Sequence, residues 1–194
     1  TRMQFSDRAT ASVLFDFDRS LGVGVLGEVG PFEWQVAVAN GIDTGGFRTT
    51  LPGDLDGNLA IATRVNWLVS GDWGKDGHAD LDYRSVPAIR LGMGFTRTRH
   101  DVAGAREFGF PRAVDSGAKI NTVLPAGVTA YDLSMYATDL NVKYCGFSFI
   151  YEYYFRNLTD FSGGTVSDLF DHGYWAEVGY FIVPEQLQLI ARHS

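Results

Sequence analysis

The sequence lacks the features of several large protein classes. It has no run of about 18 or more apolar residues, so a transmembrane helix is not expected. Its single cysteine, Cys145, cannot form an internal disulfide. Lys and Arg total 16 against 23 Asp and Glu, a net charge of −7, and no basic cluster argues for nucleic-acid binding. Neither an initiator Met nor a signal peptide is present, so we expect a processed chain or a piece of a longer one.

Motifs for catalysis and metal binding are also missing. There is no GxSxG elbow and no HExxH helix. The stretch that starts at Asp54 resembles a calcium loop, but Leu59 and Val65 occupy the positions that require Gly and Glu. Alternating acidic residues at 76–82 in a turn are more typical of a solvated loop than of a metal site. We therefore predict no enzymatic activity, cofactor or metal.

Aromatic residues and glycine, by contrast, are abundant. The chain holds 14 Phe, 9 Tyr, 4 Trp and 23 Gly. Aromatic side chains favour strands, and glycine favours tight turns. This composition indicates an all-β protein.

Apolar and polar residues alternate along much of the chain. In the segment 32–40 every second side chain is apolar, with Phe32, Trp34, Val36 and Val38 on one face and Glu33 and Gln35 on the other. A strand has a period of two, so such a segment has one apolar and one polar face. The pattern predicts eight strands, at 21–30, 32–41, 58–70, 87–99, 139–145, 147–156, 174–184 and 186–193.

The connections between these strands are of two kinds. Tight turns are expected at 30–31, 145–146 and 184–185, and a longer turn-forming stretch at 71–86. Long loops are expected at about 42–57, 100–138 and 157–173. Antiparallel hairpins place the two kinds at opposite ends of a sheet, which is typical of outer-membrane barrels.

Charged residues fall repeatedly on the face opposite the apolar one. In a soluble sandwich this face would be the outer surface, whereas in a porin it would line the pore. The aromatic-rich face of segment 147–156 favours a lipid-facing surface and therefore a membrane barrel. The predicted pore-lining residues are Arg64, Arg90, Lys143, Arg156, Arg192, Glu28, Glu33, Asp139, Glu152 and Glu177. Five basic and five acidic groups do not by themselves select for an anion.

Four segments resemble the phosphate-selective porins (O and P type) of Gram-negative outer membranes. They are the acidic-Arg-Ala stretch at 5–9, the Arg-x-Leu-Gly-Val strand entry at 18–23, the strand ending in Asn-Gly at 32–41, and the late hairpin at 174–192. The resemblance implies a homotrimer of barrels with about sixteen strands, of which this chain would supply half. A complete eight-stranded barrel stays open as an alternative, with the charged face packed as ion pairs in a filled interior and no open channel. The chain ends in Arg192-His193-Ser194 and not in the terminal aromatic residue of such barrels. None of the family's pore lysines is carried over to this chain.

We therefore expect residues 1–194 to form one domain, a transmembrane antiparallel β-barrel segment of about eight strands in a bacterial outer membrane. Its expected function is passive diffusion of small hydrophilic solutes or ions, with anions such as phosphate among the candidates. Its expected partners are the lipid bilayer and its own copies, and nucleic acid is not among them. Two alternatives stay open: a non-channel barrel with a structural or adhesive role, and a soluble carbohydrate-binding β-sandwich.

Overall fold

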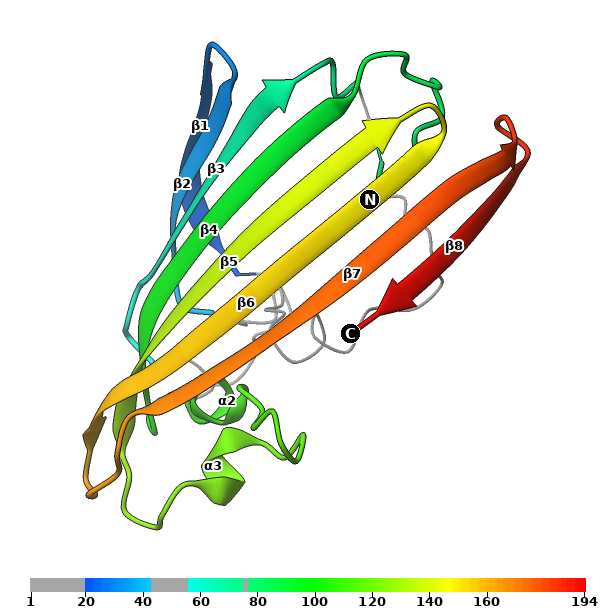
Figure 1. Ribbon diagram of the computed structural model, residues 1–194. Helices are drawn as coiled ribbons and strands as arrows, with labels where there is room; N and C mark the ends of the chain where they lie inside the picture. Colours follow the sequence, from blue (N-terminus) through cyan, green and yellow to red (C-terminus); the bar gives the residue numbers. More distant parts are fainter. Residues whose placement is uncertain (1–19, 43–55, 75–76) are drawn as a thin grey trace.

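The computed structural model describes residues 20–42, 56–74 and 77–194. It is an all-β protein in which eight antiparallel strands form one sheet (Figure 1). Each strand pairs only with its neighbours in the sequence, in the order β1 to β8. The elements are β1 (Gly22–Val29), β2 (Phe32–Ala39), β3 (Ala60–Ser70), β4 (Ala88–Asp101), α2 (Ala105–Gly109), α3 (Ile120–Val123), β5 (Ala130–Tyr144), β6 (Phe147–Ser162), β7 (Leu169–Val183) and β8 (Leu187–His193).

All eight predicted strands are present, but three are longer than expected by several residues. β5 begins at Ala130 and not at 139, β6 continues to Ser162, and β7 begins at Leu169 and not at 174. The predicted loops 100–138 and 157–173 therefore shrink to 102–129 and 163–168. Most of the predicted loop 42–57 and the motif at 5–9 lie outside the described residues.

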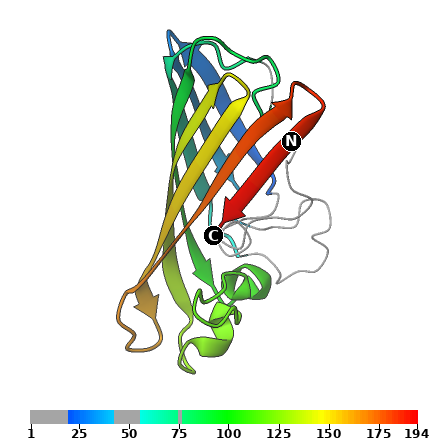
Figure 2. The same cartoon turned by 45° about the vertical axis from the view of Figure 1, so that its right-hand side comes forward.

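The sheet is strongly curved but not closed. β1 and β8 form its two edges, and no register pairs them with each other. Figure 2 shows the strands curling around a concave side, with α2 and α3 at the end of the sheet that carries the connections 102–129 and 163–168. We call this the long-loop end. The connections 30–31, 71–87, 145–146 and 184–186 lie at the other, the short-turn end.

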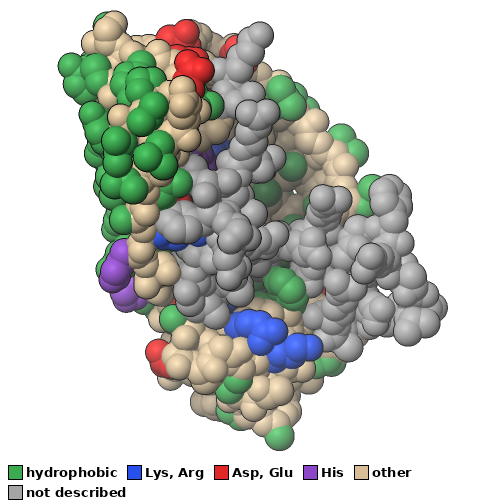
Figure 3. All heavy atoms as spheres, turned by 90° about the vertical axis from the view of Figure 1, so that its right-hand side faces the viewer, with side chains coloured by type: hydrophobic (Ala, Val, Ile, Leu, Met, Phe, Trp, Pro, Cys, Tyr) green, Lys and Arg blue, Asp and Glu red, His purple; other side chains and the backbone are tan. Residues whose placement is uncertain are grey.

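The strand register assigns the convex face to apolar side chains. Direct partners share a face, so the chain of pairs Val65–Met93–Thr138–Tyr153 runs along one side of four strands. Many of these side chains are exposed, and in the side view of Figure 3 hydrophobic side chains crowd one flank of the molecule. An exposed apolar surface of this extent marks a contact with lipid or protein.

The long-loop end reverses this polarity. On the concave face of β5, Tyr131, Leu133 and Met135 are buried, and they pack in one cluster with Phe108 of α2 and Ile120 of α3. The connection 102–129 thus folds against the concave side. Neither helix of the described chain is long and apolar enough to cross a membrane.

Candidate functional site

The concave face is the candidate site, because the register places all ten predicted pore-lining residues on it. These residues come from all eight strands of the sheet. The structure brings some of them into direct contact and pairs others with residues that the sequence did not suggest.

The central contact joins β2, β3 and β5. Nη2 of Arg64 lies 2.5 Å from Oδ2 of Asp139, and its Nε donates to Asn66 at 2.9 Å. Asn66 in turn donates to Glu33 at 3.1 Å, and Asn141 donates to Asp139 at 2.6 Å. Two predicted acids and one predicted base therefore belong to a single polar network, in which Asn66 joins Arg64 to Glu33 and Asn141 supplies a further donor to Asp139.

Gly92 makes room for this network. A Cβ at this position would lie 2.1 Å from Oδ2 of Asp139 and 2.6 Å from Nη2 of Arg64. The close approach of the ion pair to the β4 backbone therefore requires glycine here. The sequence pattern Gly92-Met93-Gly94 marks the place where small residues alternate with a convex-face side chain.

A second group lies on β6, β7 and β8. Arg192 donates to Glu177 from both Nε, at 2.9 Å, and Nη2, at 2.6 Å, and its guanidinium lies 5.2 Å from the Trp175 ring centroid. Nε1 of Trp175 donates to Glu152 at 3.0 Å, and the Tyr154 hydroxyl donates to the same carboxylate. In these contacts Glu177 pairs with the guanidinium of Arg192, whereas Glu152 accepts from the neutral side chains of Trp175 and Tyr154.

Arg156 has a partner that the sequence analysis missed. Its buried guanidinium forms an ion pair with Asp171 of β7, and its Nε donates to Oδ2 of Asp171 at 3.1 Å. Nη2 of Arg156 also donates to the carbonyl of Arg112 at 2.6 Å. Asp171 fell inside the predicted loop 157–173, so it was not assigned to a strand. The contact ties the wall of the sheet to the connection 102–129.

Removing this arginine is expected to destabilise the protein strongly. Arg156→Met should lower the free energy of unfolding by about 3–5 kcal/mol, because Asp171 and the Arg112 carbonyl lose a buried charged donor. Denaturant unfolding of the purified protein measures this. The variant Arg97→Met, which loses an ion pair at an exposed site, should unfold like the wild type. Equal effects of the two substitutions would contradict the structural role of Arg156.

The connection between β3 and β4 crosses the concave face at the short-turn end. We call residues 71–87 the rim loop, of which 71–74 and 77–87 are described. The Trp73 ring centroid lies 4.4 Å from the Arg90 guanidinium and 4.1 Å from Nζ of Lys143, and the His78 ring lies 6.4 Å from that of Trp175. The rim loop therefore reaches from β4 to β7. The sequence indicated a turn here but not that it would cover the concave side.

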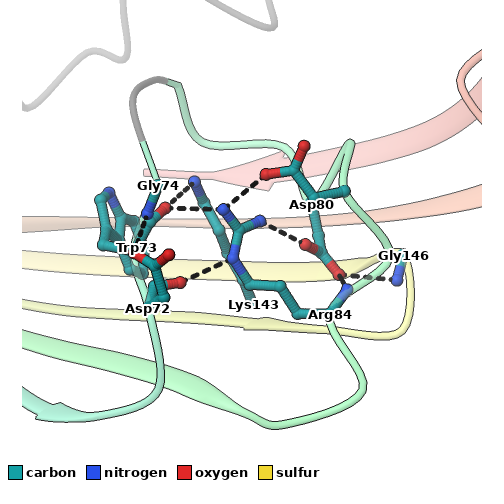
Figure 4. Close-up of polar contacts among 8 residues, drawn as sticks. Asp72, Trp73, Gly74, Asp80, Arg84, Lys143 and Gly146 are labelled. Atoms are coloured by element: carbon teal, nitrogen blue, oxygen red, sulfur yellow. Dashed lines mark hydrogen bonds and ion pairs between the residues drawn. The ribbon is translucent and has the colours of Figure 1, made fainter.

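Arg84 holds the rim loop in this shape (Figure 4). Its Nε donates to the carbonyl of Asp72 at 2.7 Å, and Nη2 donates to the carbonyl of Trp73 at 2.9 Å. Its two remaining contacts are ion pairs of 2.7 Å, to Asp80 and to Asp82. One guanidinium thus joins both arms of the loop. The acidic residues at 80 and 82 serve this arginine, and position 76 of the same pattern lies outside the described residues.

Two further contacts dock the rim loop on the sheet. The fully buried Asp80 accepts from the backbone N–H of Gly146, in the turn between β5 and β6, at 2.8 Å. The Tyr83 hydroxyl donates to the carbonyl of Phe181 in β7 at 2.9 Å. Burial of His78 lowers its pKa below the usual value, and this outweighs the opposing effect of Glu177. The imidazole is therefore neutral at neutral pH.

The concave face is hollowed on the side of β1 to β5. A cavity of about 510 Å³ has a floor of small residues from these strands, including Gly24, Ala37, Ala62, Gly94 and Ala137, and its walls include Arg64 and Tyr154. A neighbouring hollow of about 490 Å³ opens toward Glu28 and Glu33. Between the rim loop and the long-loop end, the described part of the concave side therefore combines charged side chains with two hollows.

Comparison with family models, curated proteins and solved structures finds no match for this chain. The resemblance to phosphate-selective porins accordingly stays a prediction.

Proposed function

We propose that this chain forms part of the wall of an outer-membrane β-barrel pore, through which small hydrophilic solutes or ions diffuse passively. One observation carries the proposal: the sheet separates an exposed apolar convex face from a charged, hollowed concave face. Lipid-facing and water-facing residues alternate in this way in membrane barrels. A soluble sandwich would bury the apolar face instead.

Aromatic side chains bound the apolar face at both ends. Toward the long-loop end the rings of Phe95, Tyr136 and Phe155 follow one another across three strands, at 4.9 and 5.3 Å between centroids. Toward the short-turn end, Tyr144 and Phe147 are direct partners on the same face. Rows like these match the aromatic girdles of membrane barrels. We call the surface between the two rows the apolar belt.

The height of the apolar belt fits a bilayer. In β5 it extends from Tyr136 to Tyr144, which at about 3.4 Å per residue is about 27 Å along the strand. A tilt of about 40° reduces this to about 21 Å, close to the apolar band of about 25 Å in membrane barrels. On β4, β5 and β6 the next convex-face row toward the long-loop end is polar and consists of Arg97, Ser134 and Asn157, whereas Ile61 of β3 and Phe170 of β7 continue it as apolar residues.

The open edges of the sheet support a larger barrel. In a bilayer each unpaired backbone group costs several kcal/mol, so β1 and β8 require partner strands. The convex face of β1 is apolar up to its edge, with Val23 and Val25 largely exposed. We propose that further strands of the full polypeptide complete the barrel, to the about sixteen strands and the homotrimer that the family resemblance implies.

We further propose a preference for anions at the short-turn end. Arg90 lies beside the Trp73 ring, and its buried Nε has no hydrogen-bond partner within the described chain. Lys143 lies against the same ring. Two neighbouring cations in the wall of a pore favour anions.

Reversing these two charges should shift the pore toward cations. The experiment is single-channel recording of the full-length protein in a planar bilayer, with the reversal potential measured in a salt gradient. We expect stable conductance steps and, for the wild type, a reversal potential that indicates anion selectivity. For Arg90→Glu combined with Lys143→Glu, we expect a reversal potential that is smaller or has the opposite sign. Arg97→Glu, a reversal on the convex face, serves as the control. Unchanged selectivity in the double variant would exclude the proposed role of Arg90 and Lys143.

One observation favours a second function. The rim loop crosses the concave face at one end and the connection 102–129 folds against it at the other, as expected for a plugged barrel with a structural role. Folded, membrane-inserted protein without conductance would support this alternative over the pore.

A further inference from the structure

A compact charged cluster lies on the convex face just beyond the apolar belt. In the register, Arg97 and Arg99 follow Phe95 on the same face of β4, and Asp132 of β5 is the direct partner of Arg99. The aromatic ring of Tyr136 lies between this cluster and the rest of the belt on β5. The cluster therefore occupies the level at which lipid headgroups would begin.

Asp132 holds the two arginines side by side. Its Oδ2 lies 2.8 Å from Nη2 of Arg97, and its Oδ1 lies 2.6 Å from Nη1 of Arg99. Nη2 of Arg99 also donates to the Ser162 hydroxyl at 2.8 Å. The carboxylate is only 14% exposed, whereas the two arginine side chains are 57% and 38% exposed. The anion thus lies beneath two guanidiniums that face solvent.

The cluster keeps both charge and donors for a ligand. Two guanidiniums share one close carboxylate, and Asp160 acts on Arg97 through space without forming an ion pair. Each guanidinium has five N–H donors, and the described contacts use one from Arg97 and two from Arg99. The planar fork of arginine matches the oxygens of a phosphate.

We propose that Arg97 and Arg99 bind the phosphate of an anionic lipid headgroup, in the leaflet at the long-loop end. The inference rests on the proposed membrane location. A lipid suits this position better than free phosphate, because the acyl chains of the same molecule would lie along Phe95, Tyr136 and the apolar belt. Lipid binding would fix the depth of the barrel at this level.

The test uses the full-length protein reconstituted in vesicles of equal parts phosphatidylcholine and phosphatidylglycerol. Native mass spectrometry of the extracted protein counts the retained lipids of each kind. We expect wild-type protein to enrich phosphatidylglycerol about fivefold or more, and Arg97→Gln combined with Arg99→Gln to lose that enrichment. Arg97→Lys with Arg99→Lys should keep part of it, because the charge remains without the planar fork. Arg112→Gln removes an arginine outside this cluster and should leave the phosphatidylglycerol enrichment unchanged.

Several results would overturn the inference. Equal enrichment in the wild type and the double glutamine variant would exclude the two arginines as the site. Enrichment that inorganic phosphate abolishes at millimolar concentration would indicate a free-phosphate site and exclude the lipid. If the double variant does not fold, Arg97→Gln alone should reduce the enrichment, and an unchanged value would contradict the proposal. Protein that never inserts into vesicles would refute the proposed function itself, whereas inserted protein without lipid preference would refute this inference alone.

Discussion

Replacing Met93 with arginine is expected to lower the free energy of unfolding by about 2 kcal/mol when the protein is embedded in a bilayer. Met93 lies on the convex face, one row from the middle of the apolar belt, with Val65 and Thr138 as its direct partners. An arginine on the lipid face of a membrane barrel costs about 2–4 kcal/mol at the midplane and less toward the interfaces. In water the same substitution would have little effect, because Met93 is 66% exposed and surface changes usually stay within about 0.5 kcal/mol.

The control for this prediction is Ser134→Arg. Ser134 shares the convex face with Met93 but lies in the polar row beyond Tyr136. Near the interface the expected cost falls to about 0–1 kcal/mol. Denaturant unfolding in phospholipid vesicles measures both variants. A loss confined to Met93→Arg supports lipid on the convex face, and two small, equal effects would favour the soluble sandwich.

The sequence predicted all eight strands because alternation is a local signal. One apolar face sets the register of each strand, since a slip by one residue would move every side chain to the other face. The same signal placed the ten charged residues on one side. It failed at 130–138, because the strand continues there but its polarity is reversed up to Met135: Asp132 and Ser134 are on the convex face, and Leu133 and Met135 on the concave one. A strand that leaves the apolar belt loses the pattern by which it was recognised.

The partners of the charged residues could not be predicted from the sequence. Arg64 meets Asp139 across 75 positions, and Asp80 meets Gly146 across 66. Such contacts depend on the curvature of the sheet and on how a loop folds back, and alternation encodes neither. A local signal did exist for the rim loop. Arg84 follows acidic residues at 80 and 82, and Asp80 and Arg84 are four positions apart, close enough along the chain to form an ion pair within the loop.

Replacing Arg84 with methionine is expected to release the rim loop from the concave face. The side chain makes four contacts within the loop, to the carbonyls of Asp72 and Trp73 and to the carboxylates of Asp80 and Asp82. Removing one partner of a buried ion pair costs about 3–5 kcal/mol. Because the backbone N–H of Gly146 still serves Asp80, we expect the lower end of this range.

Asp82→Asn provides the matched control. It removes a different ion pair of the same guanidinium, but the Asp82 side chain is 71% exposed. Exposed pairs contribute about 0–1 kcal/mol, so this variant should keep the rim loop docked. Amide hydrogen exchange at residues 77–87 distinguishes the two variants, because only a released rim loop should exchange faster than in the wild type. A loss of about 3 kcal/mol makes local opening about 100-fold more frequent in Arg84→Met.

Single-channel conductance then tests whether release of the rim loop changes the flow of ions through the pore. The docked rim loop places Trp73 against Arg90 and Lys143, so it covers the two cations that we propose for anion selectivity. If the rim loop narrows the pore, Arg84→Met should raise the single-channel conductance and strengthen the anion preference, because both charges become open to solute. Faster exchange at unchanged conductance would place the constriction elsewhere. Unchanged exchange would show that Arg84 does not hold the rim loop in place.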